Sequence, residues 1–198
     1  MVKKSEFWLI APYALWMVLM TSLPATPAAY AIRTAATAVL LIAAACVPDV
    51  RKAVKRTSIA GLVVGIAAGL AVFAVWVLPE QFDWHWYRRF CILGESGTAA
   101  VAETDKSLLA VRLLGSAFVI AIAEELFFRK WLIGFAGFWW MVALFAIEHD
   151  RWLVGAIAGI VYGLVAQRRG LLPAIVAHMT TNLVLGIWVL KTGQWQFW

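Results

Sequence analysis

Charged side chains are scarce in this sequence. Only 14% of the 198 residues are charged, 64% are hydrophobic and the mean hydropathy is +0.84. This composition excludes an ordinary soluble domain of this size. Apolar segments long enough to cross about 30 Å of hydrocarbon recur along nearly the whole chain. We therefore predict an all-α fold, a polytopic transmembrane helical bundle of about seven to eight membrane helices.

Cysteine is also rare, because the chain contains only Cys46 and Cys91. Neither belongs to a CxxC or Cys/His ligand pattern, which argues against a disulfide framework and a structural zinc site. Basic residues exceed acidic residues, with a net charge of +6. They form short clusters between apolar runs and no basic stripe with spaced aromatic residues. We expect contact with a lipid bilayer and no nucleic-acid partner.

No repeat period, low-complexity tract or linker divides the chain, so we expect one integral membrane domain over residues 1–198. Lys3 and Lys4 precede an apolar run and superficially resemble the start of a signal peptide. The run is longer than a signal-peptide core and lacks a convincing cleavage site, so we expect a spanning helix instead. The predicted apolar helices are 7–23, 29–48, 58–79, 107–132, 136–149, 153–167 and 171–190.

Basic clusters occur at alternate connections between these helices. They are Lys3/Lys4, the segment 51–56, Arg129/Lys130 and Arg168/Arg169. The positive-inside rule places such clusters in the cytoplasm, so we expect a cytoplasmic N-terminus. The polar segment 80–106 would then lie on the far side, where its aromatic residues favour an interfacial belt over a substrate-binding lid.

Two of the apolar helices carry glycines at every fourth position. Small residues at this spacing let neighbouring helices approach closely in a membrane. The two sets are Gly61, Gly65 and Gly69, and Gly155, Gly159 and Gly163. We interpret both as packing features without a chemical role.

Ionisable residues interrupt the apolar segment 107–132. A charge in the hydrocarbon region costs several kcal/mol, so such residues normally face the protein interior and find partners. Glu125 and Arg129 are four residues apart and share a helix face, with the acid on the favourable N-terminal side. Glu124 points about 100° away and is free to face another group. The alternative is a charged helix end at the lipid headgroups, above all for Arg129 and Lys130.

Two further apolar segments contain polar residues that could meet these acids. His149 follows Phe145 by four residues, and His178 and Asn182 share one face of their helix. At about 1.5 Å per residue, Glu125 and His178 lie roughly 13 and 12 Å above their cytoplasmic turns, and His149 roughly 20 Å. His149 alone could lie at the membrane interface, and His178 and Asn182 could simply form hydrogen bonds with a neighbouring helix. Their compatible depths instead favour a shared functional site.

These residue types suit the activation of water. A buried Glu124 near neutral pH could accept a proton and, with His149, position a water molecule. Attack on an amide carbonyl produces an oxyanion, for which His178 and Asn182 are suitable donors. No serine or cysteine occupies a nucleophile-like position in this set. A divalent metal such as zinc, held by Glu124, His149 and His178, remains an alternative.

The three motifs resemble those of a known family. Glu124-Glu125-x3-Arg129, Phe145-x3-His149 and His178-x3-Asn182, in this order on successive membrane helices, are similar to the CPBP family of CAAX-protease and Abi intramembrane enzymes. The resemblance covers a helical core of roughly 107–190. The segment 149–155 and the surroundings of His178 also resemble the exosortase-associated subgroup of CAAX-protease-related proteins, which implies a bacterial inner membrane.

The resemblance implies an intramembrane endopeptidase that acts on a membrane-associated or lipidated protein. Glu124 and His149 would activate water, His178 and Asn182 would stabilise the oxyanion, and Glu125 and Arg129 would support them. No cofactor is firmly implied, since such enzymes are described both as metalloproteases and as glutamate proteases.

Two non-proteolytic functions remain as alternatives. The first is a membrane scaffold or immunity-type protein that uses the same fold to bind a partner. The second is a proton-coupled transporter with Glu and His as a relay, although no inverted repeat supports it.

Overall fold

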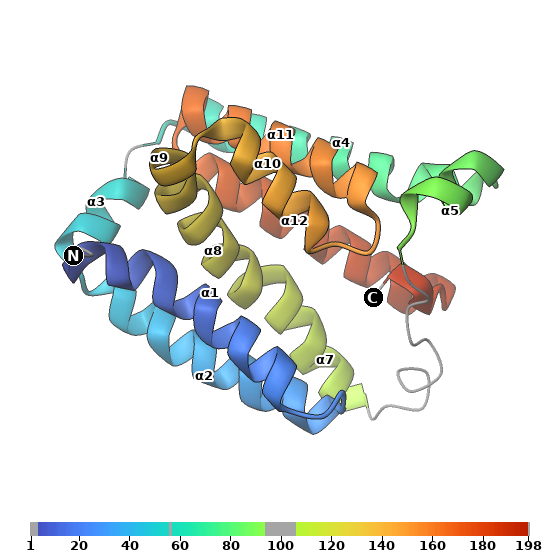
Figure 1. Ribbon diagram of the computed structural model, residues 1–198, viewed down its shortest axis with the longest axis horizontal. Helices are drawn as coiled ribbons and strands as arrows, with labels where there is room; N and C mark the ends of the chain where they lie inside the picture. Colours follow the sequence, from blue (N-terminus) through green and yellow to red (C-terminus); the bar gives the residue numbers. More distant parts are fainter. Residues whose placement is uncertain (1–3, 56, 94–105, 198) are drawn as a thin grey trace.

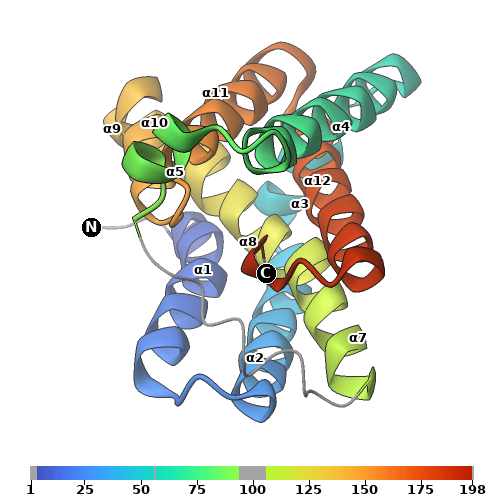
Figure 2. The ribbon, with the colours of Figure 1, turned by 90° about the vertical axis from the view of Figure 1, so that its right-hand side faces the viewer.

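The structure, a computed structural model, describes residues 4–55, 57–93 and 106–197. All regular elements in these ranges are helical, which confirms the predicted all-α class. The helices form a bundle with one long central helical stretch, residues 106–136 (Figure 1). A hairpin of α1 and α2 covers one side of this stretch, and α4, α10, α11 and α12 cover the other (Figures 1 and 2).

The N-terminal hairpin consists of α1 (Lys4–Ser22) and α2 (Pro27–Ala45), and the short α3 (Pro48–Lys55) follows it. The Thr26 hydroxyl accepts a hydrogen bond from the Ala29 N–H at 3.2 Å and caps α2. Pro27 opens this helix, where its missing N–H has no cost. Tyr13 on α1 and Tyr30 on α2 point into the main apolar core. The hairpin therefore supplies aromatic side chains to the centre of the bundle.

The next two helices are α4 (Ile59–Gln81) and α5 (His85–Cys91). Ser58 caps α4 by accepting a hydrogen bond from the Gly61 N–H at 3.1 Å. Helix α5 occupies part of the polar segment predicted at 80–106, and residues 94–105 of that segment lie outside the described residues. Lys3 and Arg56 of the basic clusters also lie outside them. The cytoplasmic position of the N-terminus remains a prediction.

The central stretch was predicted as a single α-helix over 107–132, and it differs from that prediction in its winding. It consists of α7 (Lys106–Leu114), the π-helical η1 (Gly115–Ile120), α8 (Ala121–Glu124), the π-helical η2 (Glu125–Leu132) and α9 (Ile133–Ala136). A π-helical turn widens the helix and is frequent at functional sites. In η1 the Ser116 carbonyl accepts a side-chain hydrogen bond from Asn182 at 2.9 Å.

The C-terminal half consists of α10 (Phe138–Ile147), α11 (Trp152–Arg169), α12 (Leu171–Thr192) and the 3-10 turn η3 (Trp195–Phe197). Gly137 and Gly170 precede α10 and α12 with φ of 93° and 103°, a conformation that favours glycine. Helix α10 ends two residues earlier than predicted. His149 therefore lies in the connection after α10, where its ring caps the helix by donating to the Phe145 carbonyl at 2.7 Å.

All seven predicted apolar segments coincide with helical structure. Among the described residues, the helices long and apolar enough to cross a membrane are α2, α4 and α12, and α10 is a shorter apolar helix. The predicted seven to eight membrane helices and the single-domain organisation remain predictions.

The glycines at every fourth position do bring helices together, as predicted. A Cβ atom on Gly65 would lie 2.5 Å from the Pro173 carbonyl oxygen, and one on Gly69 would lie 2.3 Å from the Ala177 oxygen. Helix α4 therefore packs against α12 backbone to backbone, one residue from His178. The second set joins α11 to α10, since a Cβ atom on Gly163 would lie 2.7 Å from the Phe138 ring.

Gly69→Ala is expected to lower the free energy of unfolding by about 1–3 kcal/mol, because overpacking forces the two backbones apart. Unfolding of the purified protein in detergent by a denaturant series measures this loss. Gly134→Ala is the matched control, since a Cβ atom there meets nothing within 4 Å. The control is expected to be neutral or slightly stabilising. Equal stabilities of the two variants would contradict a close contact at Gly69.

Candidate active site

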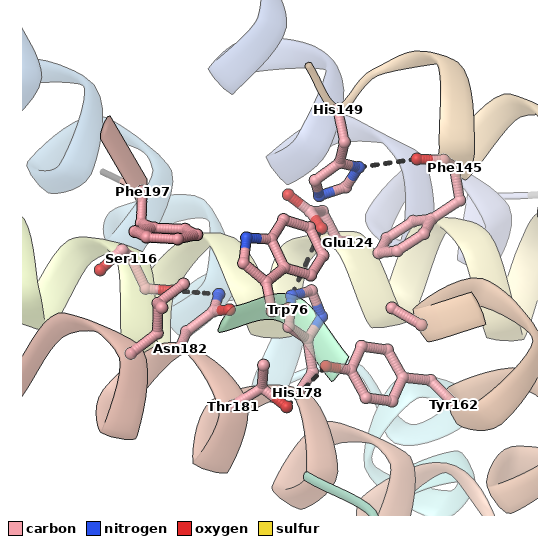
Figure 3. Close-up of a pocket in the computed structure, with 12 residues that line it drawn as sticks. Trp76, Ser116, Glu124, Phe145, His149, Tyr162, His178, Thr181, Asn182 and Phe197 are labelled. Atoms are coloured by element: carbon pink, nitrogen blue, oxygen red, sulfur yellow. Dashed lines mark hydrogen bonds and ion pairs between the residues drawn. The ribbon is translucent and has the colours of Figure 1, made fainter. Parts of the chain in front are cut away.

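A cavity of about 190 Å³ lies between the central stretch and the helices α4, α11 and α12 (Figure 3). Four of its lining residues are those predicted as catalytic: Glu124, His149, His178 and Asn182. They come from α8, the connection after α10, and α12. The structure thus brings these four side chains together around one cavity.

The supporting pair, Glu125 and Arg129, lies beside the cavity and outside its lining. Arg129 Nη1 is 3.1 Å from Glu125 Oε1, and both side chains are completely buried. The guanidinium group also lies 4.0 Å from the centre of the Phe145 ring, a cation–π contact. The acid and the base face each other as their spacing predicts, although η2 is π-helical.

Glu125 has a second partner that the sequence did not predict. Its Oε1 atom is 2.9 Å from His178 Nδ1. A carboxylate only accepts, so Nδ1 carries the proton and Nε2 faces the cavity, 3.7 Å from Glu124 Oε2. Tyr162 stacks on the imidazole with ring centres 4.9 Å apart. These contacts fix the orientation of His178 at its edge and on its face.

Thr181 and Gly69 extend this support. The Tyr162 hydroxyl donates to Thr181 Oγ1 at 2.7 Å, and Thr181 Oγ1 lies 2.8 Å from the Gly69 carbonyl oxygen. The close contact of α4 with α12 therefore positions the ring that stacks on His178.

His149 is oriented by its backbone hydrogen bond. The Phe145 carbonyl can only accept, so Nδ1 of His149 carries the proton and the neutral ring presents an unprotonated Nε2. Phe145 and Trp76 flank the ring, with centres 4.7 and 5.5 Å away. Figure 3 shows the second ring nitrogen on the side of Glu124. His149 is therefore arranged to accept a proton or to bind a cation from the cavity.

Asn182 uses part of its amide group to hold the central stretch. Its Nδ2 atom donates to the Ser116 carbonyl at 2.9 Å. The amide nitrogen has two hydrogens, so one donor remains for a group in the cavity. Asn182 thus links α12 to η1 and also lines the cavity.

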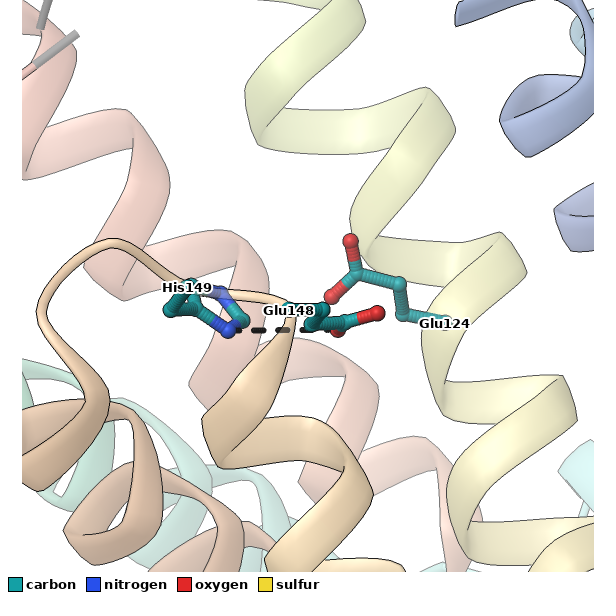
Figure 4. Close-up of side chains that lie close together, drawn as sticks. All are labelled: Glu124, Glu148 and His149. Carbon is teal, nitrogen blue, oxygen red and sulfur yellow. Dashed lines mark ion pairs between the residues drawn. The ribbon is translucent and has the colours of Figure 1, made fainter. Parts of the chain in front are cut away.

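Two residues next to this site, Glu148 and Tyr13, were not predicted from the sequence. Glu124, Glu148 and His149 each offer a ligand atom, and these atoms lie within 4.8 Å of one another (Figure 4). The Tyr13 hydroxyl donates to Glu148 Oε2, which ties α1 to the site. Glu148 had the same signal as Glu124, an acid in an apolar segment. Tyr13 had no such signal, because aromatic residues are common throughout this chain.

The donor atoms are compatible with a divalent cation, in a different set from the predicted one. The cluster contains Glu148 in place of His178. Glu124 Oε2 and Glu148 Oε1 are buried without a hydrogen-bond partner. Outer contacts from Tyr13 and the Phe145 carbonyl resemble those that orient metal ligands. Two carboxylates and an imidazole suit zinc or a similar ion.

The fold and the site together define a helical membrane protein with carboxylates and imidazoles gathered around one cavity. Residues 106–184 match the family model of the type II CAAX prenyl endopeptidase Rce1-like proteins. This match supports the CAAX-protease family that the three motifs predict. The exosortase-associated subgroup remains a prediction. The comparisons with curated proteins and with solved structures give no match.

Proposed function

We propose that this protein hydrolyses a peptide bond in a membrane-associated or lipidated protein, with water activated by Glu124 and His149. The family is one of membrane proteases, and its members act in general on membrane-associated proteins. The observation that carries the proposal is the shared cavity, into which Glu124, His149, His178 and Asn182 converge. A partly enclosed site of this kind limits contact with bulk water and strengthens electrostatic interactions with the reacting group.

Each step can be assigned to an atom of the site. A water molecule held by the Glu124 carboxylate and His149 Nε2 gives up a proton to one of them as its oxygen bonds to the amide carbon. The free N–H of Asn182 stabilises the oxyanion, and His178 Nε2 can do so when the ring carries both protons. The C–N bond then breaks, and the stored proton passes to the leaving nitrogen. The products are a carboxyl group and an amine.

A divalent ion held by Glu124, Glu148 and His149 would act as a Lewis acid and polarise the carbonyl oxygen. The residues fit such an ion, so metal dependence is decided by experiment. If the water is activated by Glu124 and His149 alone, cleavage is expected to survive a chelator. Loss of cleavage that zinc restores would support the metal-dependent alternative.

The proposal is tested with purified protein in liposomes and synthetic peptides analysed by mass spectrometry. One peptide carries a farnesylated C-terminal CAAX sequence, and matched peptides lack the prenyl group or the final three residues. We expect cleavage near the C-terminus of the intact farnesylated peptide. No cleavage of any peptide, together with unchanged cellular function of Glu124→Gln, would favour the scaffold or immunity-type alternative.

A further inference from the structure

A second cavity lies on the opposite face of the central stretch from the candidate active site. We call it the α3 groove. It has a volume of about 410 Å³ and is bordered by α2, α3, α8, η2 and α12. Its walls are almost entirely apolar and include Leu41, Ala45, Val54, Ile122, Leu126 and Met179.

Charge is confined to one border of the α3 groove. Arg51 and Lys55 line it from α3, and both side chains are exposed. They are four residues apart and therefore share a face of the helix. A smaller adjoining cavity is lined by the same two residues with Lys52 and Pro48. The groove thus combines an apolar floor with two adjacent cations at its edge.

Helix α3 is built to present these cations. Val50 is buried, and Val54 packs against the apolar cluster beneath the helix. No ion pair or hydrogen bond engages the side chain of Arg51 or Lys55 among the described residues. The acid of this helix, Asp49, lines a different cavity together with Glu6, so it does not line the α3 groove. The two charges remain available to an anion.

We propose that the α3 groove binds an anionic phospholipid, with an acyl chain on the apolar floor and the phosphate between Arg51 and Lys55. Basic pockets between membrane helices bind anionic head groups in this way. A neutral lipid would leave both cations without a counterion. A soluble anion would leave the apolar floor uncovered. Only a ligand with both parts satisfies the whole surface.

The groove is separate from the candidate active site. Ile122 and Leu126 line the groove, and Glu124, midway between them in sequence, lines the active-site cavity. Residues two positions apart point in nearly opposite directions on a helix. On α12, Met179 lines the groove while its neighbour His178 lines the cavity. A bound lipid would therefore contact the reverse face of the helices that carry the site, and its binding does not depend on the proposed proteolysis.

The test is native mass spectrometry of the full-length protein released from nanodiscs with equal amounts of palmitoyl-oleoyl phosphatidylglycerol and phosphatidylcholine. At about 1 kcal/mol for each basic residue, we expect retained phosphatidylglycerol to exceed phosphatidylcholine about 10- to 30-fold. The double variant Arg51→Gln/Lys55→Gln should lose this preference. Arg168→Gln/Arg169→Gln is the matched control, because it removes two exposed cations outside the groove and should retain the preference.

A second variant tests the apolar floor without changing charge. Ala45 is exposed on α2 and lines the groove, so Ala45→Trp should obstruct the acyl chain and reduce phosphatidylglycerol retention while the fold is kept. Equal losses in the Arg168/Arg169 control would show general surface electrostatics and overturn the proposal. A wild-type protein that retains no phosphatidylglycerol would also overturn the proposal. Complete displacement of the lipid by a neutral farnesylated peptide would overturn it as well, because it would assign the groove to a substrate.

Discussion

Glu124→Gln is expected to reduce the rate of peptide cleavage by about 10²- to 10⁴-fold, the range for removal of a general acid–base group. Glutamine keeps the size of the side chain and its capacity for hydrogen bonds but cannot take a proton from water. Glu124 lines the cavity, and its Oε2 atom is buried without a hydrogen-bond partner. The loss should therefore fall on kcat, measured with the farnesylated peptide in liposomes, while the unfolding midpoint stays unchanged.

Two other acids provide controls for this variant. Glu6→Gln removes the same charge from α1, away from the cavity, and should cleave at the wild-type rate. Glu148→Gln changes a residue near Glu124 that does not line the cavity, so we expect a smaller loss than for Glu124→Gln. Equal and complete losses of cleavage activity in Glu124→Gln and Glu148→Gln would instead favour a joint role of the two acids as metal ligands. Full activity of Glu124→Gln would contradict the proposed mechanism.

Arg129→Ala is expected to lower the free energy of unfolding by about 3–5 kcal/mol, because it leaves Glu125 as an uncompensated buried charge. Both side chains of this pair are fully buried, and the arginine also packs on Phe145. The loss can be measured by denaturant titration in detergent micelles. Lys130→Ala is the control, since this neighbouring base is exposed and should change stability by less than about 0.5 kcal/mol.

A double variant separates stability from activity at this pair. Arg129→Met combined with Glu125→Leu removes both charges and should recover most of the lost stability, because apolar residues can replace a buried ion pair. It should remain poorly active, since Glu125 also holds His178 Nδ1. A stability of Arg129→Ala equal to that of Lys130→Ala would show that the buried pair does not hold the helices together.

The helical class and the close helix contacts could be predicted from the sequence because both depend on local patterns. Apolar runs of sufficient length leave the backbone no alternative to helix in lipid. Glycines at every fourth position form one smooth face, and the contact of Gly69 with α12 follows from that spacing. The contact between Glu125 and Arg129 could be predicted for the same reason, since residues four apart meet on one helix.

The winding of the central stretch could not be predicted in the same way. The π-helical turns at η1 and η2 change the direction of side chains without a clear composition signal. A helix distant in the sequence also contacts this stretch, because Asn182 of α12 donates a hydrogen bond to the Ser116 carbonyl. The end of α10 at Ile147 likewise depends on His149, whose ring satisfies the Phe145 carbonyl.

The scarcity of charged residues was informative, because an acid in an apolar segment is costly and must have partners. By itself, the sequence determined which residues needed such partners: Glu124, Glu125, His149 and His178. Only the tertiary structure decided how they are matched. It placed Glu125 between Arg129 and His178, and it added Glu148 and Tyr13 beside Glu124. Spacing along a helix specifies neighbours on that helix, whereas the partners of a buried charge depend on how separate helices pack.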